Sequence, residues 1–185
     1  MATPPDFTTG AVLTAAQMRT IGMHLVKSQD ISTGVSVSST VVTNAFSSDY
    51  DNYRIVVSGV TSSVQQNMLF QFMSGGVPVG GADYGHAGFY QVSSGTLNGI
   101  FFTATTLEIM PMNNNGTNHI SFDVFVPNKA ERSRFVGLGG MNDSVSFFYH
   151  GVHKLATAYT DFRLVVTGGT FIGGNIRVYG YRNSL

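Results

Sequence analysis

The chain has 185 residues with ten basic and ten acidic side chains, so its formal net charge at pH 7 is zero. Charged residues make up 11% of the sequence, whereas a typical domain has about 25%. This balance argues against a nucleic-acid-binding protein, which needs a basic face to displace counterions. There is no cysteine, which excludes disulfides, thiolate metal sites and thiol nucleophiles. So few charged side chains indicate a protein that works inside an assembly.

The sequence shows no targeting or membrane-spanning segment. The first residues lack the basic and apolar regions of a secretory signal. Every apolar run is far shorter than the roughly 20 residues that a membrane-spanning helix needs. We therefore expect no membrane insertion.

Residues 1–30 differ in pattern from the rest of the chain. Thr14 and Gln17 have the spacing of a capping box, and they predict one short helix that ends at Gly22. Because so short a helix is marginal alone, it must dock on another surface. Residues 1–30 are therefore predicted to be an attachment arm. The candidate attachment residues are its apolar side chains, Phe7, Leu13, Met18 and Ile21.

From residue 31 onward the hydrophobic pattern has a period of two, which is typical of half-buried strands. Ile120, Phe122 and Val124, for example, alternate with other residues along one run. Glycine-rich and asparagine-rich breaks separate these runs, and no long amphipathic helix is indicated. The pattern predicts an all-β fold over residues 31–185, an antiparallel β-sandwich of jelly-roll type. The predicted strands are 35–43, 53–60, 67–74, 86–92, 100–103, 106–110, 119–126, 132–139, 145–154, 162–167 and 175–181.

Residues 46–59 and 155–168 are similar to each other. Each copy has a polar turn with a tyrosine, Tyr50 or Tyr159, followed by an aromatic residue, an arginine, aliphatic residues and a glycine. Two copies are too few for a solenoid. They are better explained by the approximate two-fold symmetry of a double Greek key. We expect both tyrosines to pin equivalent structural corners, with buried rings and with hydroxyls bonded to nearby backbone.

The histidines and carboxylates do not form a recognisable catalytic or metal-binding pattern. His150 and His153 are three residues apart, which puts them on opposite faces of a strand and argues against a shared metal ion. Glu108 lies in an apolar strand and Glu131 in a polar turn. The sequence therefore identifies no pair of carboxylates that would face each other across a cleft, as a glycosidase requires. We therefore expect no catalytic residue, no metal ion and no cofactor. A carboxylate pair is not excluded, which keeps a glycan-degrading enzyme as a remote alternative.

Aromatic side chains are the other candidates for binding, since the chain has 14 Phe and 8 Tyr. A tyrosine ring beside amides suits the apolar face and the hydroxyls of a sugar. Residues 75–86 and 113–118 are long or amide-rich connections, and binding side chains are often on loops. The alternative is that they form ordinary turns or lie against a neighbouring subunit. The candidate glycan contacts are Tyr84, His86 and Asn114.

Three stretches of the chain resemble small structural proteins of tailed bacteriophage virions. Residues 7–18, Phe-Thr-Thr-Gly-Ala-Val-Leu-Thr-Ala-Ala-Gln-Met, are similar to the opening of many tail-fibre proteins, although Arg19 stands where asparagine is common. Residues 44–53 and 174–183 are similar to other β-rich virion proteins, whereas residues 64–150 carry no such resemblance. The resemblance implies a homotrimeric β-sandwich, an arm that attaches to other virion proteins, and no catalysis. It also implies a location in the virion, which is assembled in the bacterial host cytoplasm.

Three functions are open at this point. The first is a trimeric tail-fibre or receptor-binding appendage, whose sandwich faces outward and contacts a host surface glycan. The second is a capsid decoration protein, a cement or head-fibre trimer on the shell. The short chain leaves no room for a long fibrous shaft, which keeps this second function open. The third is the glycan-degrading enzyme.

Overall fold

The structure is a computed structural model that describes residues 22–31, 36–92, 94–141 and 145–182. Within these ranges every regular element is a β-strand, and every strand pair is antiparallel. The all-β class predicted from the sequence is therefore confirmed. The predicted short helix lies outside the described residues. The described residues include no helix of the length and apolarity that crossing a membrane requires.

The strands follow one another along the chain with short connections. They are β1 (Met23–Asp30), β2 (Ser39–Val42), β3 (Tyr50–Ser62), β4 (Gln66–Ser74), β5 (Val77–Pro78), β6 (Tyr84–Val92), β7 (Leu97–Ala104), β8 (Leu107–Met112), β9 (Asn118–Phe125), β10 (Arg132–Met141), β11 (Val145–Ala156), β12 (Asp161–Val166), β13 (Phe171–Ile172) and β14 (Asn175–Arg182).

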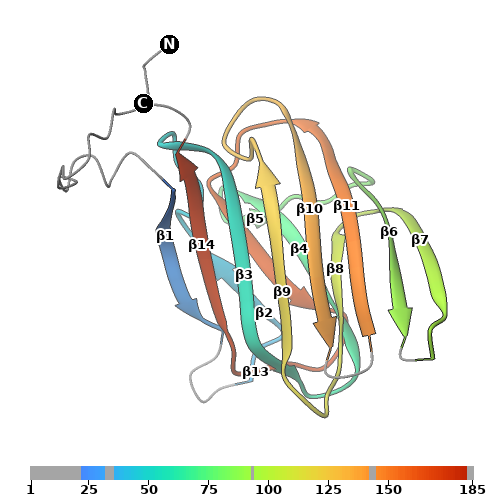
Figure 1. The fold of residues 1–185 in the computed structure, drawn as a ribbon. Coiled ribbons are helices and arrows are strands. Elements are labelled where there is room, and N and C mark those ends of the chain that lie inside the picture. Colours follow the sequence, from blue (N-terminus) through green and yellow to red (C-terminus); the bar gives the residue numbers. More distant parts are fainter. Residues whose placement is uncertain (1–21, 32–35, 93, 142–144, 183–185) are drawn as a thin grey trace, which may run out of the picture.

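Two antiparallel sheets lie face to face and form a sandwich (Figure 1). The large sheet has the order β1-β14-β3-β9-β10-β11-β6-β7, and β13 pairs with β3. The small sheet has the order β2-β12-β4-β5, and β8 also pairs with β4. Consecutive strands therefore often lie in different sheets, which means that most of the pairing is between residues far apart in the sequence.

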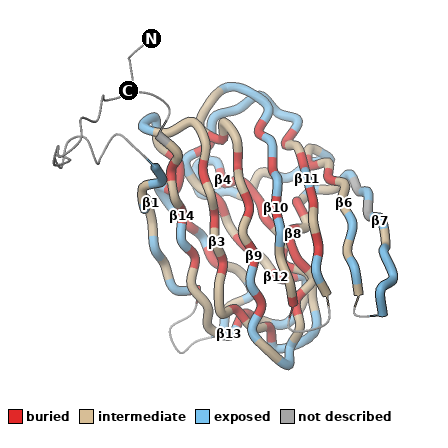
Figure 2. The backbone as a smooth tube through the Cα atoms, in the orientation of Figure 1, coloured by how far each residue is buried: buried red, intermediate tan, exposed pale blue. Residues whose placement is uncertain are grey.

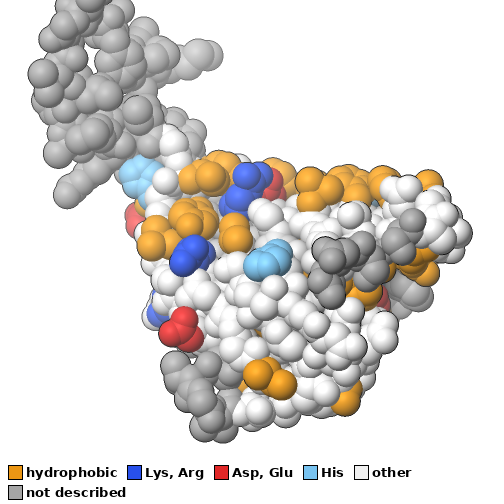
Figure 3. Space-filling view, turned by 60° about the horizontal axis from the view of Figure 1, so that its bottom comes forward, with side chains coloured by type: hydrophobic (Ala, Val, Ile, Leu, Met, Phe, Trp, Pro, Cys, Tyr) orange, Lys and Arg blue, Asp and Glu red, His pale blue; other side chains and the backbone are white. Residues whose placement is uncertain are grey.

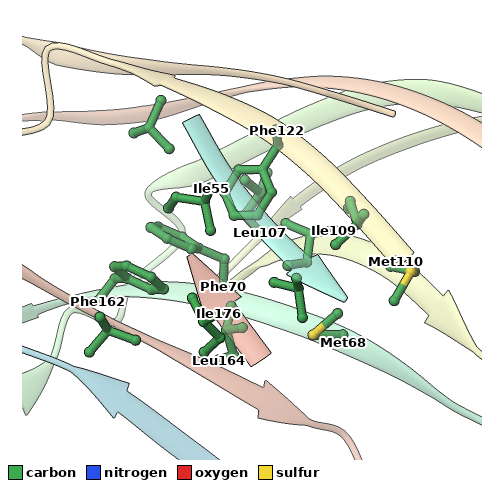
Figure 4. Packing of buried hydrophobic residues seen from close by; sticks show 14 of the residues in the cluster. Ile55, Met68, Phe70, Leu107, Ile109, Met110, Phe122, Phe162, Leu164 and Ile176 are labelled. Carbon is green, nitrogen blue, oxygen red and sulfur yellow. The ribbon is translucent and has the colours of Figure 1, made fainter. Parts of the chain in front are cut away.

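Alternating side chains from the two inner faces form the core. Along β9, Ile120, Phe122 and Val124 are buried, and the residues between them are more exposed, as the sequence pattern predicts. Figure 4 shows Ile55 and Phe122 of the large sheet and Phe70 of the small sheet filling the space between the layers. The rings of Phe70 and Phe122 meet edge to face with centroids 5.8 Å apart. Such a pair stabilises the fold by about 0.5–1.5 kcal/mol beyond the burial of its area.

The large sheet is wider than the small one. In Figure 2, β6 and β7 extend past the second layer and carry mostly intermediate or exposed residues. Glycines on β10 let two aromatic rings of β11 lie flat across the inner face of this wider part. A Cβ on Gly137 would lie 2.3 Å from Cε1 of Tyr149, and a Cβ on Gly139 would lie 2.4 Å from Cζ of Phe147. No larger residue fits at these two positions unless the rings move.

The predicted strands are present with ends that differ by a few residues. The predicted boundary of the arm at residue 30 is wrong, however, because Met23–Asp30 forms β1 and pairs with β14. A register shift between Leu25 and Lys27 interrupts the alternation of β1, and Val26 packs against the core. An edge strand with a bulge shows no clear period of two in its sequence. Residues 23–30 therefore belong to the sandwich and not to the arm.

Candidate functional site

Two of the three predicted glycan contacts lie inside the protein. Tyr84, at the start of β6, is fully buried, and its Oη accepts a hydrogen bond of 2.8 Å from the backbone N–H of Phe72. Burial raises the pKa of the Tyr84 phenol. His86 is also buried, and burial lowers its pKa. The expectation that both stand on an exposed loop is wrong, because β6 begins at Tyr84 and its alternation turns both side chains inward.

Asn114, the third predicted contact, is exposed in the turn between β8 and β9. Neighbouring amides build this turn. The backbone N–H of Asn113 donates to Oδ1 of Asn118 at 3.0 Å, and Nδ2 of Asn118 donates to the backbone oxygens of Asn113 and Val60. Asn118 is fully buried. The asparagine-rich stretch is thus an anchored turn, and Asn114 is the predicted contact that the structure leaves at the surface.

The structure bears on the predicted arm only where it joins the sandwich. Gly22 has a φ of 87°, and β1 starts at the next residue. The docking of the arm on a partner protein stays a prediction. The predicted attachment residues Phe7, Leu13, Met18 and Ile21 lie outside the described residues.

The two corner tyrosines differ from their prediction. The ring of Tyr159 is buried, as predicted, and stacks on Phe72 with centroids 4.4 Å apart. Its hydroxyl, however, has no hydrogen-bond partner among the described residues, and burial raises the pKa of its phenol. At the first corner, Tyr53 rather than Tyr50 holds the backbone. Its Oη accepts from the Ser47 N–H and donates to the Ser47 carbonyl, both at 2.7 Å. The ring of Tyr50 covers Gly180 of β14 instead.

The two strand histidines point to opposite faces of β11, as predicted. His150 is exposed, and His153 is fully buried. The ring centroid of His153 lies 4.5 Å from that of Tyr84 and 5.3 Å from those of Phe72 and Tyr159. Burial lowers the pKa of His153, and the Asp83 charge opposes this effect. No group of three potential metal ligands occurs among the described residues.

An apolar surface lies on the outer face of the four strands β10, β11, β6 and β7. Leu138 stands opposite Phe148, which in turn stands opposite Phe89 on the next strand. In the adjacent row, Val136 stands opposite the exposed His150, which stands opposite Ala87 and then Phe101 on β7. We call this surface the extension face and define it by six residues: Phe89, Leu97, Phe101, Val136, Leu138 and Phe148.

Several side chains of the extension face are highly exposed. The exposed fraction is 63% for Leu138 and 77% for Phe101, and the rings of Phe89 and Phe148 lie together at 5.5 Å between centroids. Figure 3 shows hydrophobic side chains in several separate groups on the visible surface, and charged side chains lie beside the groups at the left. A contiguous apolar group of this kind marks an interaction site on a folded domain.

Charged groups stand beside the extension face. Arg132 and Arg134 are exposed at one end of β10, and neither forms an ion pair among the described residues. Further along, on the side of β9 and β3, Asp123 accepts bidentate hydrogen bonds of 2.8 Å from Arg54 and a third of 2.8 Å from the Tyr181 hydroxyl. An apolar centre with a polar rim is the usual anatomy of a protein interface.

On the inner side of the same strands, a cleft of about 360 Å³ opens along the edge of β8. Asn67 of β4 and Glu108 and Met110 of β8 line one side, and Tyr90 of β6 and Phe147 of β11 line the other. The volume is at the low end of the range of about 300–1,000 Å³ found for small-molecule sites. Sequence reasoning missed this cleft, because its two walls belong to different sheets.

Comparison with protein-family models and with curated proteins finds no match to this chain.

Proposed function

We propose that eight of the strands form a jelly roll. In the large sheet they are β1-β14-β3-β9, and in the small sheet they are β2-β12-β4-β8. Followed along the chain, these eight strands alternate between the sheets except at β4 and β8, which are neighbours in the small sheet, in the manner of two Greek keys. Of the six remaining strands, β6, β7, β10 and β11 are then insertions that widen the large sheet beyond the eight, and the two-residue strands β5 and β13 pair with β4 and β3.

The internal repeat supports this proposal. The first copy lies on β3, the third strand of the four in the large sheet, and the second copy lies on β12, the second strand of the four in the small sheet. A two-fold axis between the sheets would superimpose the four strands of one sheet on the four of the other in reverse order. The third strand of the large sheet and the second strand of the small sheet would then exchange places. In both copies the arginine binds a side chain of a neighbouring strand: Arg54 binds Asp123, and Arg163 binds Gln71.

We infer that the extension face is the contact between subunits of a homotrimer. Its strands are additional to the eight of the jelly roll, and its six apolar side chains lie on their outer face. Fully burying a side chain such as Leu or Phe stabilises an assembly by about 1.5–3 kcal/mol, and this face offers six large apolar residues on each subunit. A closed symmetric contact would remove them from water on every subunit at once.

On these grounds the proposed function is that of a non-enzymatic structural component of a tailed bacteriophage virion. It would be a trimeric tail-fibre or receptor-binding appendage that is attached through the residues before β1. The observation that carries the proposal is the apolar extension face. The resemblance of residues 7–18 to tail-fibre openings and the use of jelly rolls in viral proteins support it. Of the predicted glycan contacts, Asn114 remains available at the surface for a host glycan.

Capsid decoration is the second candidate. The specific observation in its favour is that all the described strands belong to one sandwich, with no elongated shaft among the described residues. A tail fibre normally reaches away from the particle, whereas a decoration protein lies on it.

Electron cryomicroscopy of the intact particle, with the protein carrying a C-terminal tag for antibody labelling, tests the proposal. The proposal requires label on the virion, on the tail for the first candidate and on the head for the second. Virions that lack the protein, purified from cells that make it in quantity, would refute a structural role.

A further inference from the structure

Among the described residues, the lining of the cleft beside β8 has one carboxylate and no opposing charge. Glu108 is half-buried in its wall. No lysine, arginine or histidine lines the cleft, and Glu108 forms no ion pair among the described residues. The nearest polar partner is the side chain of Asn67, whose hydrogen bond opposes the rise that burial causes in the pKa of Glu108. Among the described residues, Glu108 thus has a neutral hydrogen-bond partner and no cationic one.

The rest of the cleft is suited to a large, weakly hydrated cation. The rings of Tyr90, Phe147 and Tyr149 and the thioether of Met110 line it. Aromatic faces attract cations, and thioethers are polarizable. Removing a carboxylate from water has a free-energy cost unless a partner compensates it. A cation that also fills the apolar space would offset this cost.

We propose that the cleft binds an organic ammonium group, with Glu108 as its counter-ion and the ring of Tyr90 as its platform. An anionic ligand is disfavoured by Glu108. A neutral ligand of the same shape would gain the apolar contacts but would leave the carboxylate unpaired. A methylated ammonium fits better than a small inorganic cation, because the lining provides one carboxylate and few other oxygen ligands.

This inference concerns one small-ligand site on the subunit. It goes beyond the proposed virion role and does not depend on it. The cleft lies on the inner side of the strands whose outer side forms the extension face, so its ligand and a neighbouring subunit would meet opposite faces of the same strands.

Calorimetric titration of the full-length protein tests the proposal with two probes of matched shape, choline and its uncharged isostere 3,3-dimethylbutan-1-ol. We expect choline to bind the wild type at least about tenfold more tightly than the isostere, since only the cation gains the charge and ring interactions. Equal affinity for the two probes would show that the cleft recognises apolar shape alone and would overturn the proposal, as would no measurable choline binding.

Three variants locate the interaction. Glu108→Gln keeps the shape and removes the charge, and it should weaken choline binding by about tenfold or more without changing that of the isostere. Glu131→Gln is the matched control, because Glu131 is exposed in the turn before β10 and does not line the cleft. Tyr90→Leu keeps an apolar side chain but removes the ring face, and it should lower the affinity for choline more than that for the isostere. Unchanged choline binding in Glu108→Gln, or an equal loss in Glu131→Gln, would overturn the assignment. Melting curves of each variant check that the fold is kept.

Discussion

Replacement of Tyr53 by Phe isolates the contribution of a single hydroxyl to the first corner. The ring is fully buried and packs edge to face against Phe46 with centroids 4.9 Å apart, so Phe keeps the same packing. The loss falls on Ser47, whose N–H has the Tyr53 hydroxyl as its acceptor. The Ser47 carbonyl keeps the amide of Asn128 as a donor. One part-buried N–H is thus left unpaired, and we expect the free energy of unfolding to fall by about 2 kcal/mol, within the 1–3 kcal/mol usual for such a group.

Urea unfolding followed by tyrosine fluorescence measures this effect, at one fixed protein concentration because an oligomer's stability depends on it. The matched control is Tyr50→Phe. The hydroxyl of Tyr50 forms no hydrogen bond among the described residues, so this change should alter stability by less than about 0.5 kcal/mol. If Tyr53→Phe has no effect, or if Tyr50→Phe is equally destabilising, Tyr53 does not pin the corner and the reasoning fails.

Three further predictions concern the sandwich. Gly137→Ala should lower the free energy of unfolding by about 1–3 kcal/mol through overpacking, whereas Gly99→Ala, with no atom within 4 Å of the added Cβ, should be nearly neutral in the same urea titration. The free energy of unfolding should fall between about pH 7 and pH 5. Burial lowers the pKa of His153 in the folded protein, so the unfolded chain takes up the proton first, near pH 6.5. His153→Phe should flatten this pH dependence, and an unchanged slope would contradict its assignment to His153. Melting followed by circular dichroism should be the same for a chain that begins at Gly22 as for the full-length protein. A chain that begins at Ile31 should be destabilised, because β14 then loses its pairing with β1. Equal melting of the two shortened chains would mean that β1 is dispensable.

Local pattern was enough to predict most strands, but not the edges of the sandwich. Alternation identifies β9, because Ile120, Phe122 and Val124 face a complete second layer. It fails at β1, where a bulge interrupts the period and one face meets solvent. Residues 75–86 read as a loop because of their glycines, yet Tyr84 begins β6. The identity of the corner tyrosine likewise depends on where β3 starts relative to the turn, which composition does not reveal.

The candidate surfaces depend on non-local pairing, and the sequence contains no local signal for them. The extension face exists because β11 pairs with β6, so that Phe148 meets Phe89 across residues far apart in the chain. The cleft exists because its walls come from different sheets, with Glu108 on β8 and Tyr90 on β6 both in its lining. In the sequence, Glu108 is simply an acid in an apolar strand.

The mass of the protein in solution tests the central claim most directly. Light scattering of the full-length wild type at micromolar concentration should give three times the chain mass of 19.8 kDa. Leu138→Glu places a charge in the middle of the extension face and should give a folded monomer. Val77→Glu, at a side chain equally exposed but on β5, should stay trimeric. A monomeric wild type, or a Leu138→Glu variant that keeps the mass of the trimer, would contradict the assignment of the extension face as the contact between subunits.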